Sequence, residues 1–161
     1  MQIYLLSAIG LLTFWLFCDK SRWRELYPSA MFMTYVRFVE QYILVEILHV
    51  WTYDNLTNPF SSYMNTPVIV DLFFYSSMGY LFVQKWPLRR PARLFYVVGW
   101  ALLFTIDEYI AVLHGTIKFK APWGVFESFM LFVTALVLLV IQYEFYSRKF
   151  KINRTTDPKT P

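Results

Sequence analysis

The feature that most constrains the fold is an apolar stretch from Arg93 to His114 that carries two adjacent carboxylates, Asp107 and Glu108. A run of about 20 predominantly apolar residues is long enough to cross the hydrocarbon core of a bilayer. A charged carboxylate near the middle of a membrane costs about 2.5–3.5 kcal/mol on insertion scales, and such groups usually serve a function. We therefore expect both acids to face protein rather than lipid.

The rest of the chain repeats this apolar pattern. Hydrophobic residues make up 57% of the 161 residues and aromatic residues 21%, more than the roughly 45–50% apolar content of soluble domains. The sequence predicts an all-α fold, an integral membrane bundle of five transmembrane helices in one domain, residues 1–147, followed by a basic cytoplasmic tail, 148–161. The predicted helices are about 2–17, 28–51, 66–86, 93–114 and 122–146.

Prolines and one glycine mark the predicted helix ends. Pro28, Pro67 and Pro122 suit the first turn of the second, third and fifth helices, where the missing N–H has no intrahelical partner. Gly115 suits the C-terminal cap of the fourth helix. Residues 117–120 alternate between apolar and basic, which is typical of a short interfacial strand or turn.

Basic residues predict the orientation in the membrane. The connection after the first helix has three Lys or Arg residues, the one after the third has four and the tail has five, whereas the opposite side has two. The positive-inside rule therefore places the N-terminus outside and the C-terminus in the cytoplasm. Because the positive charge follows this pattern, we expect no nucleic-acid partner. The expected partner is the lipid bilayer. A partner membrane protein or a second copy of the chain is a further candidate.

Polar residues within the predicted spans gather near the outer side. At a rise of about 1.5 Å per residue, seven of them lie within about 11 Å of the outer interface. We expect an outward-opening polar cluster formed by the second to fifth helices, with the first helix peripheral. Its candidate members are Glu46, His49, Asp71, Asp107, Glu108, His114 and Glu127.

Arg37 and Glu40 lie deeper and three residues apart, which favours a separate structural ion pair on the second helix. His114 and Glu127 are close enough to the interface to be simply solvated. The remaining acids exceed the cations near them, which fits proton handling, cation binding, acid–base chemistry or interhelical hydrogen bonding.

The sequence contains no nucleotide-binding or hydrolase motif, so catalytic residues and cofactors stay unassigned. The spacing of the histidines and acids matches no standard metal site, and we predict none. The single Cys18 excludes an intramolecular disulfide and is expected to be inert.

Several features from the third helix onward occur in a recognisable order. They are Pro67 opening an apolar helix, the basic turn Trp86–Arg93, the pair Glu108–Tyr109, the segment Gly115–Lys120, and a Trp before a last apolar helix that ends in aromatic and basic residues. In these features, over about 100 residues, the chain resembles an uncharacterised family of small multi-pass membrane proteins from Bacillus-like, spore-forming bacteria. The second helix is more charged than the family pattern. The resemblance implies a multi-pass protein of the bacterial cytoplasmic membrane and supplies no known activity.

Three functional hypotheses follow. The leading one is a non-enzymatic membrane protein whose acidic cluster packs helices or binds a cation, proton or partner; paired acids without a cavity would fit a purely structural role. A membrane-embedded enzyme acting on a lipid or isoprenoid through paired carboxylates would need a lipid-sized groove. A small proton or cation transporter subunit would need a polar path that continues inward past Glu40 and Arg37.

Overall fold

Helices dominate the computed structural model, which describes residues 2–53 and 67–156, with side chains for residues 4–53 and 67–147. The helical elements in chain order are α1 (Gln2–Phe17), η1 (Lys20–Arg22), α2 (Trp23–Gln41), η2 (Tyr42–Ile47), α4 (Val68–Val70), η3 (Asp71–Tyr75), α5 (Ser76–Gln84), α6 (Arg90–Leu113) and α7 (Val125–Thr156). The two strands are β1 (Trp51–Tyr53) and β2 (Ile117–Phe119). The predicted helical class is therefore confirmed.

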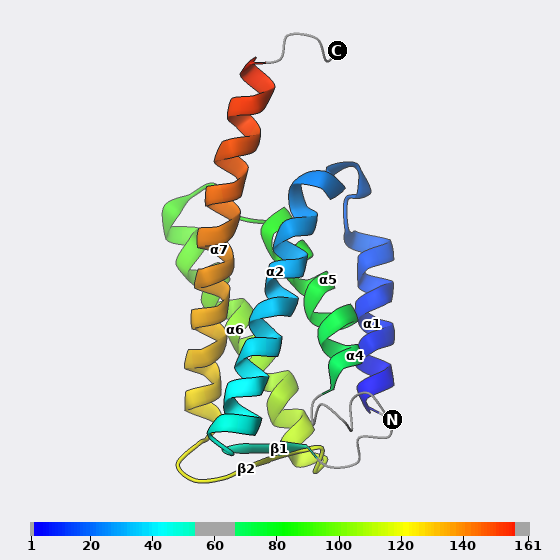
Figure 1. The fold of residues 1–161 in the computed structure, drawn as a ribbon, viewed down its shortest axis with the longest axis vertical. Coiled ribbons are helices and arrows are strands. Elements are labelled where there is room, and N and C mark those ends of the chain that lie inside the picture. Colours follow the sequence, from blue (N-terminus) through cyan, green and yellow to red (C-terminus); the bar gives the residue numbers. More distant parts are fainter. Residues whose placement is uncertain (1, 54–66, 157–161) are drawn as a thin grey trace.

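The helices form a bundle in which successive segments alternate in direction (Figure 1). The π-helical segment η2 continues α2, and the π-helical segment η3 joins α4 to α5. α2 lies at the centre, between α5 and α7, while α6 packs on α7 and α1 packs on α4, η3 and α5. α1 begins at the end of the bundle that carries the strands, and α7 ends at the opposite end.

The strands join two connections that are far apart in sequence. β1 follows η2 and β2 follows α6, and they pair antiparallel with Trp51 opposite Phe119 and Tyr53 opposite Ile117. Trp51 is fully buried, and its ring packs on the rings of Phe119 and Trp123 at centroid distances of 6.0 Å. The predicted second helix, 28–51, is therefore wrong at its end, because Trp51 is recruited into this strand pair. Of the two structures predicted for residues 117–120, a strand or a turn, the strand is the one observed.

The helix ends follow local chemistry. Gly115 has φ +70°, and hydrogen bonds from Gly115 N to Val112 O (2.9 Å) and from Thr116 N to Ala111 O (2.9 Å) form a Schellman cap. The predicted role of Gly115 is confirmed. Pro122, by contrast, lies in a turn closed by the Trp123 N to Lys120 O bond (3.0 Å), so the last helix begins later than predicted.

The other predicted boundaries shift as well. The second helix begins at Trp23, so Pro28 lies inside α2 rather than at its start. The third helical segment begins at Val68 with Pro67 as its N-cap; the predicted start at residue 66 lies outside the described residues. α6 begins at Arg90 instead of 93. α7 continues to Thr156, so the first part of the predicted tail is helical.

Two glycines allow close contact between helices. A Cβ added at Gly10 of α1 would lie 2.5 Å from the Phe73 backbone O, and one added at Gly79 of α5 would lie 2.7 Å from Met33 Cβ. Small residues at such positions let helix backbones approach closely, as they do in membrane bundles.

Within the described residues, two helices are long and apolar enough to cross a membrane, Arg90–Leu113 and Val125–Ser147. Two shorter apolar helices are Tyr4–Phe17 and Val68–Gln84. These lengths and compositions fit membrane association, and they also occur in the core helices of soluble proteins.

Candidate functional site

Arg37 of α2 occupies the centre of a buried polar network. Its Nη1 donates to Glu40 Oε2 at 2.8 Å, and its Nε lies 3.9 Å from Asp71 Oδ1 of η3. The three side chains are buried, with relative exposures of 3%, 10% and 0%. The predicted Arg37–Glu40 ion pair is present. It is not separate from the acidic cluster, however, because Asp71 belongs to both.

Asp71 is held by further contacts. Gln41 Nε2 donates to Asp71 Oδ1 at 3.1 Å, and Thr34 Oγ1 donates to the Asp71 backbone O at 3.4 Å. Among the described residues, Asp71 Oδ2, Gln41 Oε1 and Arg37 Nε have no hydrogen-bond partner. The network is therefore incomplete, which is unusual because buried polar groups are normally hydrogen-bonded.

Aromatic rings enclose the guanidinium. The Arg37 Cζ lies 4.4 Å from the centroid of the Tyr75 ring and 5.1 Å from that of Phe132. Both distances fall within the range of cation–π attraction, which is stronger where water is excluded. These contacts fix the charged group in the interior.

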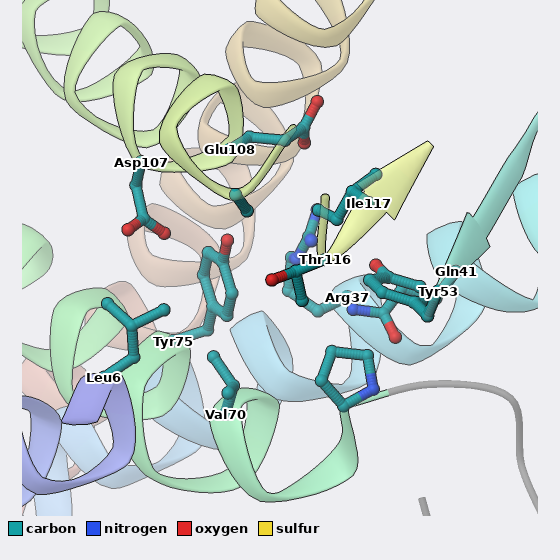
Figure 2. Close-up of a pocket in the computed structure, with 12 residues that line it drawn as sticks. Leu6, Arg37, Gln41, Tyr53, Val70, Tyr75, Asp107, Glu108, Thr116 and Ile117 are labelled. Atoms are coloured by element: carbon teal, nitrogen blue, oxygen red, sulfur yellow. The ribbon is translucent and has the colours of Figure 1, made fainter. Parts of the chain in front are cut away.

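A cavity of about 40 Å³ lies next to this network, lined by residues from α1, α2, β1, α4, η3, α6 and β2. Figure 2 shows that Arg37, Tyr75 and Thr116 surround its centre, with Gln41 and Tyr53 on one side and Leu6 on the other. Its volume exceeds the roughly 10–15 Å³ of water-sized space that one buried water needs. The cavity can hold a few waters.

The two acids of α6 differ in their surroundings. Figure 2 shows the Asp107 carboxylate directed toward Leu6 and Tyr75, whereas the Glu108 carboxylate points away from Tyr75 and Thr116. Asp107 is partly exposed, whereas Glu108 is 4% exposed and neither of its carboxylate oxygens has a hydrogen-bond partner among the described residues. The Ser128 hydroxyl of α7, which accepts a bond from Trp123 Nε1 at 3.0 Å, is a hydrogen-bond donor beside Glu108.

The structure does not bring the other four predicted members into this site. Glu46, His49, His114 and Glu127 are exposed. The Nδ1 atom of each histidine lies 2.8 Å from the backbone carbonyl four residues earlier. The predicted single cluster therefore divides into a buried centre and exposed residues, and helix one contributes only the apolar Leu6 to the cavity lining.

Two features of the site were not assigned from sequence. Tyr75 lines the cavity, and two π-helical segments meet it, because η2 follows Gln41 directly and η3 begins at Asp71. π-helical turns inside helices occur frequently at functional sites. The spacing of Gln41, four residues after Arg37, groups it with the Arg37–Glu40 pair from sequence, whereas no sequence signal indicated Tyr75 or the π turns.

The structure also bears on metal binding and on the thiol. In the described part of the chain, no group of three or more His, Cys, Asp or Glu side chains is arranged to hold a metal ion.

At the end of the bundle opposite the strands, burial raises the pKa of the Cys18 thiol to about 11. Nearby, hydrogen bonds from Ser21 hold the pKa of Asp19 below its usual value.

Comparisons with protein-family models, curated proteins and solved structures gave no match to the chain. The functional assignment therefore depends on the site itself.

Proposed function

We propose that the chain is a non-enzymatic multi-pass membrane protein of the cell membrane, with five spans, the N-terminus outside and the C-terminus in the cytoplasm. Its buried polar centre binds protons or small cations that enter from the outer side. The family resemblance extends this proposal to the bacterial cytoplasmic membrane.

Exposed apolar side chains support the membrane assignment. Trp15 of α1 is 72% exposed, Phe95 of α6 is 77% exposed and Phe126 of α7 is 70% exposed. Soluble monomers rarely expose large continuous apolar surfaces. Arg37 and Glu40 of α2, in contrast, are buried, so the middle of this helix can meet lipid with its remaining surface.

The observation that carries the binding proposal is an imbalance of charge. Only Arg37 among the described cations lines the cavity, while Asp107 and Glu108 also line it and Glu40 and Asp71 already share the guanidinium. An uncompensated buried charge costs several kcal/mol. A proton or a small cation supplies the missing positive charge.

The alternatives receive less support. A lipid or isoprenoid substrate needs a lipid-sized groove that reaches the paired acids, and the cavity that Asp107 and Glu108 line has room for a few waters. A small proton or cation transporter needs a polar path that continues beyond Arg37. The side chains there, Met33, Phe132 and Leu136, are apolar and fully buried. A purely structural role accounts for Glu40 and Asp71, which are paired, and leaves Glu108 unexplained.

Thermal unfolding of the purified protein tests the binding proposal. A ligand that binds only the folded state raises the melting temperature as its concentration increases. We expect stabilisation either as the pH falls from alkaline to neutral or on addition of Na⁺, K⁺ or NH₄⁺ at constant ionic strength. A melting temperature that responds to none of these refutes the proposal.

Cysteine accessibility tests the topology in a Cys18→Ser background. Lys120, next to β2, and Leu88, between α5 and α6, are both exposed. A membrane-impermeant maleimide should label Lys120→Cys in intact cells and Leu88→Cys only after permeabilisation. The reverse pattern would overturn the orientation, and equal labelling of both in intact cells would overturn the spans between them.

A further inference from the structure

We propose that the ligand of the polar centre is a proton, that Glu108 carries it, and that water in the cavity delivers it. This inference rests on the proposed function and narrows it to one ligand and one residue.

Arg37 already interacts with two other acids. Its guanidinium donates to Glu40 at 2.8 Å and lies 3.9 Å from Asp71. Asp71 also receives the Gln41 amide at 3.1 Å. Both contacts favour the ionised forms of these two acids.

Glu108 has no cation or amide donor of this kind. It is 4% exposed and neither oxygen is in hydrogen-bond geometry with a described residue; the Ser128 hydroxyl is the donor that lies close enough to interact with it. The titratable, charged and hydroxyl groups around it are Arg37 and Glu40 of α2, Tyr53 of β1, Tyr75 of η3, Asp107 of α6 and Ser128 of α7. Two of them are acids that oppose a further negative charge. A neutral carboxylic acid avoids this repulsion and gains an O–H donor.

The same surroundings disfavour a metal ion. Hard cations require several converging oxygen ligands, and the described His, Cys, Asp and Glu side chains form no such group. The Arg37 guanidinium lines the cavity as well and repels a second cation. A proton bonds directly to one oxygen and needs no converging set.

The cavity supplies the route. Glu108 is one of its lining residues and the cavity has room for a few waters, and buried waters commonly bridge otherwise unpartnered polar atoms. Arg37 Nε and Gln41 Oε1, both unpartnered and both on cavity-lining residues, offer one donor and one acceptor to such waters.

Infrared spectroscopy of the purified wild type, Glu108→Gln and Asp107→Asn tests this inference at neutral pH. We expect the C=O stretching band of a protonated carboxylic acid in the wild type, its loss in Glu108→Gln and its retention in Asp107→Asn. The pH dependence of the melting temperature should weaken only in Glu108→Gln. Asp107 is the matched control because it is the neighbouring acid on the same helix.

Other outcomes overturn the inference in distinguishable ways. A band that persists in Glu108→Gln assigns the proton elsewhere. Stabilisation by Na⁺ or K⁺ that Glu108→Gln abolishes makes the ligand a metal cation, so the inference fails and the proposed function survives. If neither pH nor cations matter, both fail. Glutamine imitates the neutral acid in shape, so a Glu108→Gln variant that does not fold also contradicts a protonated Glu108.

Discussion

Replacing Arg37 by Met tests how much the buried network depends on its single guanidinium. The structure provides a matched control, because Arg22 pairs with Glu25 at the same N–O distance of 2.8 Å and the same sequence spacing. The two pairs differ in burial, with relative exposures of 3% and 10% for Arg37 and Glu40 but 38% and 32% for Arg22 and Glu25.

Burial sets the expected magnitudes. Removing one partner of a buried ion pair costs about 3–5 kcal/mol, because the other charge stays in the interior uncompensated. Here Arg37→Met leaves both Glu40 and Asp71 without their buried cation. Removing one partner of an exposed pair typically costs about 0–1 kcal/mol, so Arg22→Met should have a far smaller effect.

The assay is reversible unfolding by SDS in mixed micelles, followed by circular dichroism. A triple variant, Arg37→Met with Glu40→Gln and Asp71→Asn, leaves no buried charge in this group and should recover much of the lost free energy of unfolding. The reasoning is refuted if Arg37→Met costs no more than Arg22→Met, or if the triple variant is no more stable than the single one.

Two further predictions concern packing and the thiol. Gly10→Ala should lower the free energy of unfolding by about 1–3 kcal/mol, since overpacking has that cost and the new Cβ would lie 2.5 Å from the Phe73 backbone O. Gly99→Ala is the control, because its Cβ meets nothing within 4 Å, and it should be neutral or stabilising. Equal losses of stability in the two variants would contradict the close approach of α1 to η3. Because burial raises the pKa of Cys18 to about 11, maleimide should label the native protein at neutral pH much more slowly than the unfolded protein, and similar rates would contradict its burial.

Local signals predicted much of the fold. The apolar runs located all five helical segments, Gly115 marked the end of α6, and the alternation at 117–120 indicated β2. These features depend on residues close together in sequence. The end of α2–η2 depends on Trp51, whose ring packs on residues far along the chain, so no nearby signal could indicate that the helix stops.

The site was harder to predict because depth along a helix does not determine which way a side chain faces. Asp71 and Glu46 were placed at similar depths, yet Asp71 is buried and Glu46 is exposed. The π-helical segment η2 separates Gln41 from Glu46, and a π turn holds more residues than an α turn. Face assignments made with α-helical spacing therefore fail across it, and His49 lies beyond the helix altogether.

The pairing of β1 with β2 has a consequence for the order of assembly during synthesis. Trp51 emerges from the ribosome long before its partner Phe119, with α4, η3, α5 and α6 made in between. Until Ile117–Phe119 has been synthesised, the Trp51 surface lacks its partner and the cavity beside Arg37 lacks the wall that Thr116 and Ile117 supply. The polar centre is thus completed late, and a nascent chain arrested before β2 holds its buried charges in an unfinished site.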